Sequence, residues 1–448
     1  MDEQTLVIDL DQRTIRPIHY LGSKLRVLNQ ISDAIESVGC GGRVCDLFSG
    51  SGTVSYHLAK KWPVTSVDIQ EYSRVICSAI NQKKDNLLDI SIVVSEVKGS
   101  KLLECLNYCY EPLISYEEMA LKKAHDGNPL PVCEIVEFGS LHSKLYKYNN
   151  IQIEYKQVLK EVESRLREKK IDKSPVSIIS RYYGGIYFSY KQAVQLDSIL
   201  DVVFKNKSNK DYLLAILLST TSEIVNTVGK HFAQPINPRK KDGSPKKNIV
   251  KRIEKDREVS VIDTFSKWGG VYNSIAPSNF DNKAYRMDYM DALKALTFEG
   301  VEVIYADPPY TRDHYSRYYH VLETMCLRDN PLISKSCLGG GNIPSKGAYR
   351  IDRRQSPFSI KSRAPEAFHN LFKGAKSIGA KMVLSYSPYV DSESRPRLLT
   401  ISQIQSIASK YYKRVETVGV NGIAHSKFNV SSLNYDKPDE AEVLMLCA

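Results

Sequence analysis

Hydrophobic residues follow two different periods along the chain. Apolar runs rich in β-branched and aromatic side chains occupy 43–48, 64–68, 301–306 and 381–386, and each predicts a short buried strand. Between the first two runs, residues 53–61 are spaced as in a helix, so strand, loop, helix and strand follow one another. Further strands are predicted over 413–420 and 442–447. This order predicts an α/β fold that begins with a βαβ unit.

The stretch from about residue 81 to residue 284 departs from this pattern. Its periodicity is weaker, tyrosine and lysine are frequent, and it is too long for a simple crossover between neighbouring strands. We therefore predict an inserted domain, which divides the chain into 1–85, 86–283 and 284–448. Within the insertion, residues 181–189 combine aromatic side chains, glycines and an arginine. This segment either stacks on bases or packs a small core.

Composition narrows the class of protein. The 448 residues are 42% hydrophobic, as in an ordinary globular core, and the formal net charge of +11 fits a polyanionic partner without proving one. Nine cysteines without a Cys-x-x-Cys pair argue against a disulfide framework and against a structural metal. No apolar stretch approaches a membrane span, and the start lacks the pattern of a signal peptide. We expect a cytoplasmic protein with neither membrane nor metal.

Two glycine-containing segments near the start are candidate cofactor loops. Residues 20–24, Tyr-Leu-Gly-Ser-Lys, precede a helical pattern and form either an ordinary capped helix start or a site for an anion or zwitterion. Residues 46–52, Asp-Leu-Phe-Ser-Gly-Ser-Gly, follow the first strand, and Asp68 ends the second strand at about the spacing of an acidic residue that binds ribose hydroxyls. Ser55 replaces the third glycine of a dinucleotide loop, so a nucleoside without a pyrophosphate is favoured.

Residues 307–310, Asp-Pro-Pro-Tyr, follow the strand over 301–306 and form the most specific candidate site. Two prolines stop both strand and helix, so this loop is stiff and lies at the edge of the sheet where ligands bind. A carboxylate and a carbonyl left free by the following proline both accept hydrogen bonds from one exocyclic amine, while a tyrosine ring stacks on a flat base. The alternative is a Pro-Pro turn that only ends a strand. His314 and His320 are candidate bases, although a structural role or a substrate contact is favoured.

Two cationic segments are candidate nucleic-acid contacts. Seven of the fourteen residues 239–252 are basic, and Gly243 and Pro245 predict a mobile loop. A second group of basic residues over 350–363 is interleaved with Tyr349 and Phe358. The alternative is that both segments are simply solvated. The predicted DNA contacts are Arg239, Lys240, Lys241, Lys246, Lys247, Arg350, Arg353, Arg354 and Lys361.

Four of these segments occur in the order of a known family. The order is 20–24, then 46–52, then Asp68 with Ile69, then a long insertion, then 307–310. In this arrangement the chain resembles the D12 class of S-adenosylmethionine-dependent adenine-specific DNA methyltransferases, which includes the Dam-like enzymes. The clear match covers about 18–80 and 284–390. The resemblance implies a class I methyltransferase Rossmann-like sheet, with 1–85 and 284–448 as the catalytic domain and 86–283 as an inserted target-recognition domain.

The resemblance also implies roles for individual residues. Asp307, Pro308, Pro309 and Tyr310 would be catalytic, and no metal is needed. S-adenosylmethionine would be bound by Tyr20, Gly22, Lys24, Asp46, Phe48, Gly50, Gly52, Asp68, Ile69 and Asp291, with Asp288 as the alternative to Asp291. The implied partner is double-stranded DNA, and a cognate restriction endonuclease is a candidate second partner.

The predicted function is therefore methyl transfer to N6 of an adenine flipped out of duplex DNA. Residues 307–310 form the predicted amine clamp. Because this clamp recognises an amine rather than a whole base, an RNA adenine-N6 or a DNA cytosine-N4 methyltransferase is the nearest alternative. A nicotinamide-dependent oxidoreductase on the same fold is disfavoured by Ser55 and by the clamp. A non-catalytic DNA-binding module is disfavoured by the intact cofactor motifs.

Overall fold

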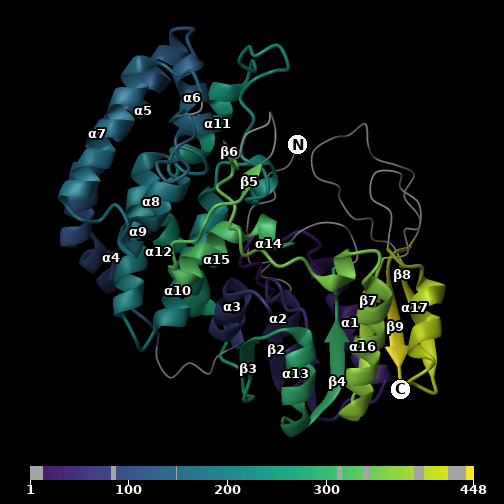
Figure 1. The fold of residues 1–448 in the computed structure, drawn as a ribbon. Coiled ribbons are helices and arrows are strands. Elements are labelled where there is room, and N and C mark those ends of the chain that lie inside the picture. Colours follow the sequence, from purple (N-terminus) through teal and green to yellow (C-terminus); the bar gives the residue numbers. More distant parts are fainter. Residues whose placement is uncertain are drawn as a thin grey trace. The chain divides into compact units, whose positions relative to one another are not determined.

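The computed structural model describes residues 14–81, 87–147, 149–309, 315–336, 343–387, 398–421 and 440–448 (Figure 1). Tyr310 and His314, both named above as site candidates, lie outside these ranges. The chain divides into two compact units. Unit 1 comprises Met1–Asn86, Ile275–Ser316 and Arg354–Ala448, and unit 2 comprises Leu87–Ser274 and Arg317–Arg353. The segment 317–353, which the sequence analysis placed in the part 284–448, thus folds with unit 2.

A seven-stranded sheet forms the centre of unit 1. Its order is β3 (Lys283–Arg286), β2 (Val64–Asp68), β1 (Arg43–Asp46), β4 (Val301–Ala306), β7 (Lys381–Tyr386), β9 (Glu440–Cys447) and β8 (Val415–Asn421). The pairs from β3 to β7 are parallel, whereas β9 is antiparallel to both of its neighbours. This mostly parallel sheet confirms the predicted α/β class I methyltransferase fold.

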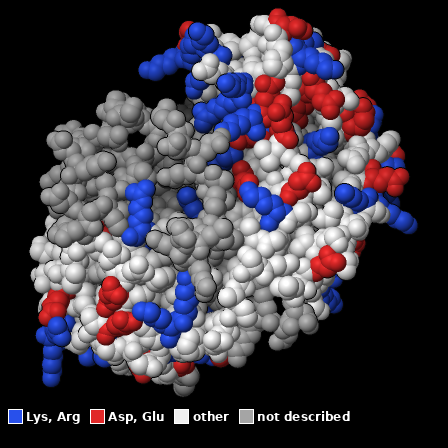
Figure 2. Space-filling model, turned by 180° about the vertical axis from the view of Figure 1, so that it is seen from behind, with Lys and Arg blue, Asp and Glu red and all other residues white. Residues whose placement is uncertain are grey.

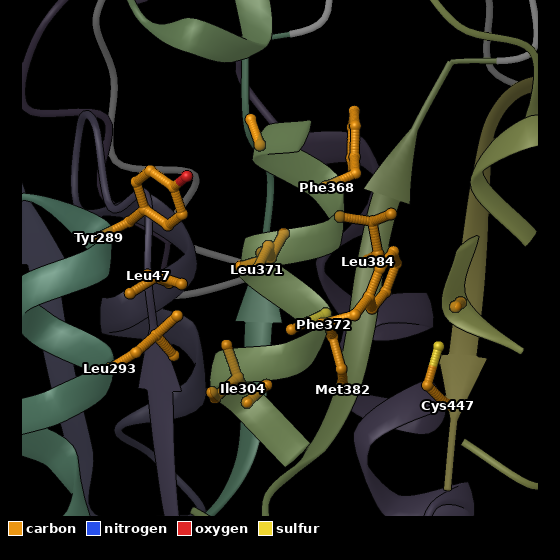
Figure 3. Packing of buried hydrophobic residues seen from close by; sticks show 14 of the residues in the cluster. Leu47, Tyr289, Leu293, Ile304, Phe368, Leu371, Phe372, Met382, Leu384 and Cys447 are labelled. Atoms are coloured by element: carbon orange, nitrogen blue, oxygen red, sulfur yellow. The ribbon is translucent and has the colours of Figure 1, made fainter. Parts of the chain in front are cut away.

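Helices cover both faces of this sheet because successive side chains of a strand point to opposite sides. In β4, Ile304 and Ala306 face the first core, while Val303 and Tyr305 face the second. The first core includes α13 (Tyr289–Ala295), α16 (Ala364–Ser377) and α17 (Ile401–Ala408), and Figure 3 shows Phe368, Leu371 and Phe372 of α16 packed against Leu384 and Met382 of β7. The second includes α1 (Leu28–Ser37) and α2 (Thr53–Leu58). Next to α2, α3 (Glu71–Asn81) packs beside β2 and β3.

Unit 2 is almost entirely helical. Its helices are α4 (Ile90–Lys98), α5 (Lys101–His125), α6 (Leu130–Phe138), α7 (Ile153–Glu168), α8 (Ile178–Tyr183), α9 (Tyr190–Lys205), α10 (Lys210–Ile224), α11 (Ile249–Arg257), α12 (Val261–Ser274) and α15 (His320–Leu327). A small antiparallel pair, β5 (Lys335–Ser336) and β6 (Ile343–Pro344), completes the described part. The short helix α14 (Tyr315–Tyr318) includes the boundary between the units.

The aromatic segment 181–189 belongs to the core of unit 2. Tyr182, Tyr183, Tyr187 and Phe188 are all fully buried. The three tyrosine hydroxyls are satisfied internally, as in the bond from Tyr183 to Thr324 of 3.0 Å. The alternative that this segment stacks on bases is therefore wrong, and the alternative that it packs a core is confirmed.

Two kinds of feature are absent from the described ranges. None of the helices there combines the length and apolarity that a bilayer crossing requires. In the same ranges, no three His, Cys, Asp or Glu side chains are grouped so that they would hold a metal ion.

Candidate active site

Three acidic residues mark the carboxyl ends of three neighbouring strands in unit 1. Asp46 ends β1, Asp68 ends β2, and Asp307 follows β4. Asp46 pairs in register with Ser66 on one side and with Tyr305 on the other. Asp68 and Asp307 therefore lie two residues beyond the partners of Asp46, and alternation along the strands directs all three to one face of the sheet. The carboxyl edge of adjacent parallel strands is where α/β proteins bind ligands.

The loop after β1 is built around the carboxylate of Asp68. The backbone N–H of Gly50 donates to Asp68 over 3.0 Å, and that of Gln70 donates over 2.8 Å. Ser49 fixes the start of the loop, because its hydroxyl donates to the carbonyl of Asp46 over 2.8 Å. Each carboxylate oxygen has two lone pairs, so Asp68 retains acceptor capacity for a further donor such as a hydroxyl.

The two glycine-containing segments meet at Tyr20 and Gly50. Gly50 has a φ of +52°, and a Cβ at this position would lie 2.6 Å from the ring of Tyr20. Only glycine fits both the conformation and the close approach. Gly22, with a φ of +79°, approaches the hydroxyl of Tyr315, whose ring centre is 6.0 Å from that of Tyr20. Tyr20, Gly22 and Gly50 are thus brought together as the sequence predicted, and Tyr315 joins them without having been predicted.

Asp46 is buried, with 1% of its surface exposed. Its carboxylate accepts a hydrogen bond of 2.6 Å from Ser55, whose hydroxyl also accepts one from Ser66. Burial is the largest cause that raises the pKa of Asp46, to about 7, and the charges of Asp307 and Asp68 raise it further while the bond from Ser55 opposes them. Burial likewise raises the pKa of Asp68, against the backbone N–H groups that lower it. Ser55, which replaces the third glycine of a dinucleotide loop, therefore supports Asp46.

Lys24 forms a buried bridge between two carboxylates. Its Nζ lies 3.2 Å from Asp307 and 3.2 Å from Glu442, and the side chain is only 4% exposed. Glu442 in turn accepts a hydrogen bond of 2.7 Å from Ser385 of β7. One alternative for residues 20–24 was an ordinary capped helix start, but neither the 3-10 turn over Leu25–Val27 nor α1, which begins at Leu28, has a side-chain cap hydrogen bond. Lys24 therefore holds the carboxylate of Asp307 in place.

Glu442 was missed by the sequence analysis. It lies in β9, where Leu444 and Leu446 occupy the same face and pack in the core with α1 and α2. The period of two along this strand places a carboxylate at an inward position, which is an unusual place for an acidic residue. That irregularity was a readable signal, but only the pairing of β9 with β7 brings Glu442 to Lys24.

The remaining cofactor candidates lie around this edge in different ways. Phe48 packs on Tyr289 and Phe358 at ring-centre distances of 6.0 and 5.5 Å. Gly52 has a φ of +75° and a Cβ there would meet Ile80 of α3 at 2.8 Å. Ile69 is half-buried directly after Asp68. Phe48 and Gly52 thus belong to the loop after β1, and Ile69 follows the end of β2.

The structure distinguishes Asp288 from Asp291. Met287 donates its backbone N–H to the carbonyl of Asp68 over 2.8 Å, which brings Asp288 next to the end of β2. The side chain of Asp288 caps α13 and lies 3.4 Å from Arg354. Asp291 instead has a 69% exposed side chain that pairs with Lys294. Of the two, Asp288 is closer to the end of β2 that carries Asp68.

The predicted DNA contacts differ in burial and in pairing. Arg239 pairs with Glu137 over 2.8 Å, and Arg350 is 5% exposed and binds Asp329 through both ends of its guanidinium. The exposed members are Lys240, Lys241, Lys246, Lys247, Arg354 and Lys361. Arg353 is half-buried over the ring of Tyr349. Arg350 therefore has a structural role, and its assignment as a DNA contact is dropped.

Net charge does not by itself identify a binding surface. Figure 2 shows that Lys and Arg side chains are interspersed with Asp and Glu on the face of the molecule that it presents.

Residues 239–245 form a tight turn in which Lys240 and Ser244 are hydrogen-bonded and Gly243 has a φ of +84°. The exposed lysines of this segment are therefore presented by a defined turn.

Comparison with known proteins addresses the family directly. Residues 20–102 match the model of the D12 class N6 adenine-specific DNA methyltransferases. The resemblance derived from the motifs is confirmed. The chain is also 23% identical to "Modification methylase LlaI" of Lactococcus lactis subsp. lactis over 406 residues, which cover 89% of this chain and 52% of that protein.

Two further relatives extend this comparison beyond the D12 class model. "Type II methyltransferase M.FokI" of Planomicrobium okeanokoites is 25% identical over 405 residues, which cover 88% of this chain and 47% of that protein. The "23S rRNA (uracil(747)-C(5))-methyltransferase" of Pyrococcus abyssi is 35% identical over 89 residues, which cover 20% of this chain and 21% of that protein. The chain thus spans about half the length of the first two relatives.

Proposed function

We propose that this chain is a sequence-specific DNA adenine-N6 methyltransferase that uses S-adenosylmethionine. The observation that carries the proposal is the position of Asp307, two residues beyond the register partner of Asp46 and across β1 from Asp68. An amine clamp and a nucleoside-binding loop thereby share one edge of a sheet. The D12 class match and the two modification methylases support the choice of adenine in DNA.

The residues at this edge fit the proposed cofactor. Gly50 lacks the Cβ that would collide with Tyr20, so the two glycine-containing segments pack closely at this edge. Asp68 would bind the ribose hydroxyls, and Asp46 and the loop over Phe48–Gly52 would hold the methionine part, with Ile69 beside the adenine ring. We propose Asp288 rather than Asp291 for the adenosine end. S-adenosylmethionine would supply a methyl group activated by a sulfonium.

Asp307 and Pro308 would act on the substrate amine. Adenine N6 does not reach a buried methyl donor while the base is stacked in a duplex, so the base must leave the helix. Asp307 and the carbonyl of Pro308 would then accept hydrogen bonds from the two N–H groups of the amine and orient its lone pair toward the methyl carbon. Tyr310 would stack on the base. Orientation by Lys24 and electrostatic stabilisation by Asp307 would supply the rate.

Unit 2 is the proposed target-recognition domain. It is helical, is inserted between β-strands of the catalytic sheet, and carries the exposed lysines of the segment 239–247. The names of the two longer relatives support a place in restriction and modification, with a cognate endonuclease as a partner. Because this chain spans about half the length of both relatives, the proposal does not extend to everything that those longer proteins do.

The decisive experiment is methyl transfer from labelled S-adenosylmethionine to duplex DNA, single-stranded DNA and RNA, followed by nucleoside analysis. We expect N6-methyladenine in duplex DNA alone. Asp307→Ala should abolish transfer and leave cofactor binding nearly intact, measured by the thermal shift that the cofactor produces. Label in RNA, or in N4-methylcytosine, would refute the substrate and retain the clamp chemistry. Near-normal turnover of Asp307→Ala would refute the clamp.

A further inference from the structure

Two arginines of unit 2 share one tyrosine ring. The guanidinium carbon of Arg317 lies 4.7 Å from the ring centre of Tyr349, and that of Arg353 lies 5.3 Å from it. Both distances are within the range of a cation–π contact. Arg317 belongs to α14 and Arg353 ends the segment 317–353, so tertiary structure alone brings them to the same ring.

Each guanidinium is fixed by only part of its donor set. Arg317 donates from Nε to the carbonyl of Ala233 over 3.1 Å and from one terminal nitrogen to the Tyr349 hydroxyl over 3.3 Å. Arg353 donates from Nε to the carbonyl of Arg350 over 2.7 Å. The Tyr349 hydroxyl itself donates to Ala233, which holds the ring in place. A guanidinium has five N–H donors, so both arginines keep donors for a further acceptor.

Neither arginine has a carboxylate partner within the described ranges of the chain. Other arginines of unit 2 differ in this respect, since Arg257 pairs with Glu117, Arg328 with Asp201, and Arg350 with Asp329. Burial and the charge of Arg317 lower the pKa of Arg353, which indicates that the two cations lie close enough to repel one another. Half-buried like charges are stabilised by a nearby anion.

Among the described residues, the aromatic neighbours of this pair carry no negative charge. His320 is fully buried with its ring centre 5.0 Å from that of Tyr349. Burial, followed by the charges of Arg353, Arg350 and Arg317, holds the pKa of His320 well below its usual range, so this ring is a neutral wall. Tyr187 and Phe232 also pack edge-on against His320. The arginine pair is therefore a cationic site on a rigid aromatic support.

We propose that Arg317, Tyr349 and Arg353 form a binding site for a phosphodiester of the DNA backbone. The planar guanidinium fork matches phosphate oxygens, and two of them on one rigid ring position a strand rather than read its sequence. This assignment rests on the proposed function, because DNA supplies the phosphate. It adds Arg317, which no charge run in the sequence indicates. It also places Arg353, a predicted DNA contact, beside a second arginine on the same ring.

The test is duplex binding by the full chain, measured by fluorescence anisotropy across a salt series without any turnover. Arg317→Gln with Arg353→Gln should lower affinity about ten- to hundredfold and reduce the slope of log affinity against log salt by about 0.9, as expected for one phosphate that is no longer neutralised. The loss should be equal for methylatable and unrelated duplexes. The matched control, Lys160→Gln with Lys207→Gln, removes two exposed charges of unit 2 and should leave both quantities nearly unchanged.

Two additional arms separate the alternatives. Arg317→Lys with Arg353→Lys keeps the charge and should bind better than the glutamine pair but worse than the wild type, because the fork is lost. Inorganic phosphate should stabilise the wild type against heat only weakly. Strong stabilisation by phosphate that the glutamine pair abolishes, with duplex binding unchanged, would assign the site to a small anion and overturn the DNA assignment.

Failure of this site is distinguishable from failure of the proposed function. A wild-type chain that transfers methyl groups to DNA, together with a folded glutamine pair whose affinity and salt slope match the wild type, overturns the phosphate site alone. Folding of the variant is checked by its thermal transition and circular dichroism. A wild-type chain that neither binds nor methylates duplex DNA overturns the proposed function itself, and the phosphodiester assignment with it.

Discussion

Lys24 and Glu442 form a buried ion pair of 3.2 Å, although they are more than four hundred residues apart in the sequence. The same ammonium lies 3.2 Å from Asp307. We infer that Glu442 positions Lys24 and that Lys24 positions the clamp carboxylate. A cation shared by two carboxylates tolerates the loss of one partner better than the two carboxylates tolerate the loss of the cation.

Lys24→Met should therefore be the more damaging variant at this bridge. It leaves Asp307 and Glu442 without their shared cation, and we expect a loss of ~10²-fold or more in the single-turnover rate, together with ~3–5 kcal/mol of stability. Glu442→Gln retains an acceptor for Lys24 and should cost about tenfold in rate with cofactor affinity nearly unchanged. Equal turnover of both variants and the wild type would contradict a positioning role.

The buried carboxyl of Asp46 should make stability depend on pH. Its pKa rises from an ordinary value of 3.8 to about 7, so between these values the folded state binds a proton that the unfolded state has lost. Stability therefore falls as pH rises through this window, by about 1.4 kcal/mol per pH unit from this group. Asp46→Asn removes the group, so the variant should gain ~2–3 kcal/mol relative to the wild type between pH 5 and pH 7.

This difference is measured by urea denaturation of both proteins without cofactor at each pH. Because the comparison is between two proteins at the same pH, contributions from all other titrating groups cancel to first order. Parallel pH profiles for the wild type and Asp46→Asn would show that burial does not hold the proton.

Gly50→Ala tests the close approach of the two glycine-containing segments. Alanine at Gly50 meets both an unfavourable φ of +52° and the ring of Tyr20 at 2.6 Å. Gly300→Ala is the matched control, because it has a φ of +65° but nothing within 4 Å. The control should cost only the ~1–2 kcal/mol of the left-handed conformation. The Gly50 variant should cost more and should also weaken cofactor binding, measured by calorimetry.

Equal losses of stability and equal cofactor affinities for Gly50→Ala and Gly300→Ala would contradict this prediction. They would show that the Tyr20 ring moves aside at little cost and that the loop around Gly50 does not bind the cofactor. A cofactor affinity that falls only for Gly50→Ala supports the loop as the binding site. Both measurements are made on the full chain.

The exposed lysines of the segment 239–247 should contribute to DNA binding through charge alone. Replacing Lys240, Lys241, Lys246 and Lys247 with glutamine should weaken duplex binding and reduce the salt slope by about 0.9 for each phosphate that the variant no longer neutralises. Arg239→Gln should act differently, because it leaves Glu137 without its partner over 2.8 Å. We expect it to lower thermal stability and leave the slope nearly unchanged. An unchanged slope for the quadruple variant would show that these lysines are only solvated.

The sequence by itself determined the α/β fold class, most strand positions and the motif order. The strands over 64–68, 301–306 and 381–386 match the observed β2, β4 and β7 because their composition and period are local properties. The glycines at 22, 50 and 52 were also singled out from the sequence, and all three have a positive φ in the structure. The resemblance to the D12 class followed from the same local signals in register.

Tertiary structure decided what each charge does. Lys24 is bound by Glu442 from the far end of the chain, Arg350 is paired with Asp329, and Arg317 meets Arg353 on one ring. It also assigned the segment 317–353 to unit 2, against the sequence-based boundary. Charge has no period along a chain, and an ion pair depends on distance in space, so spacing alone did not separate a structural arginine from one open to a phosphate.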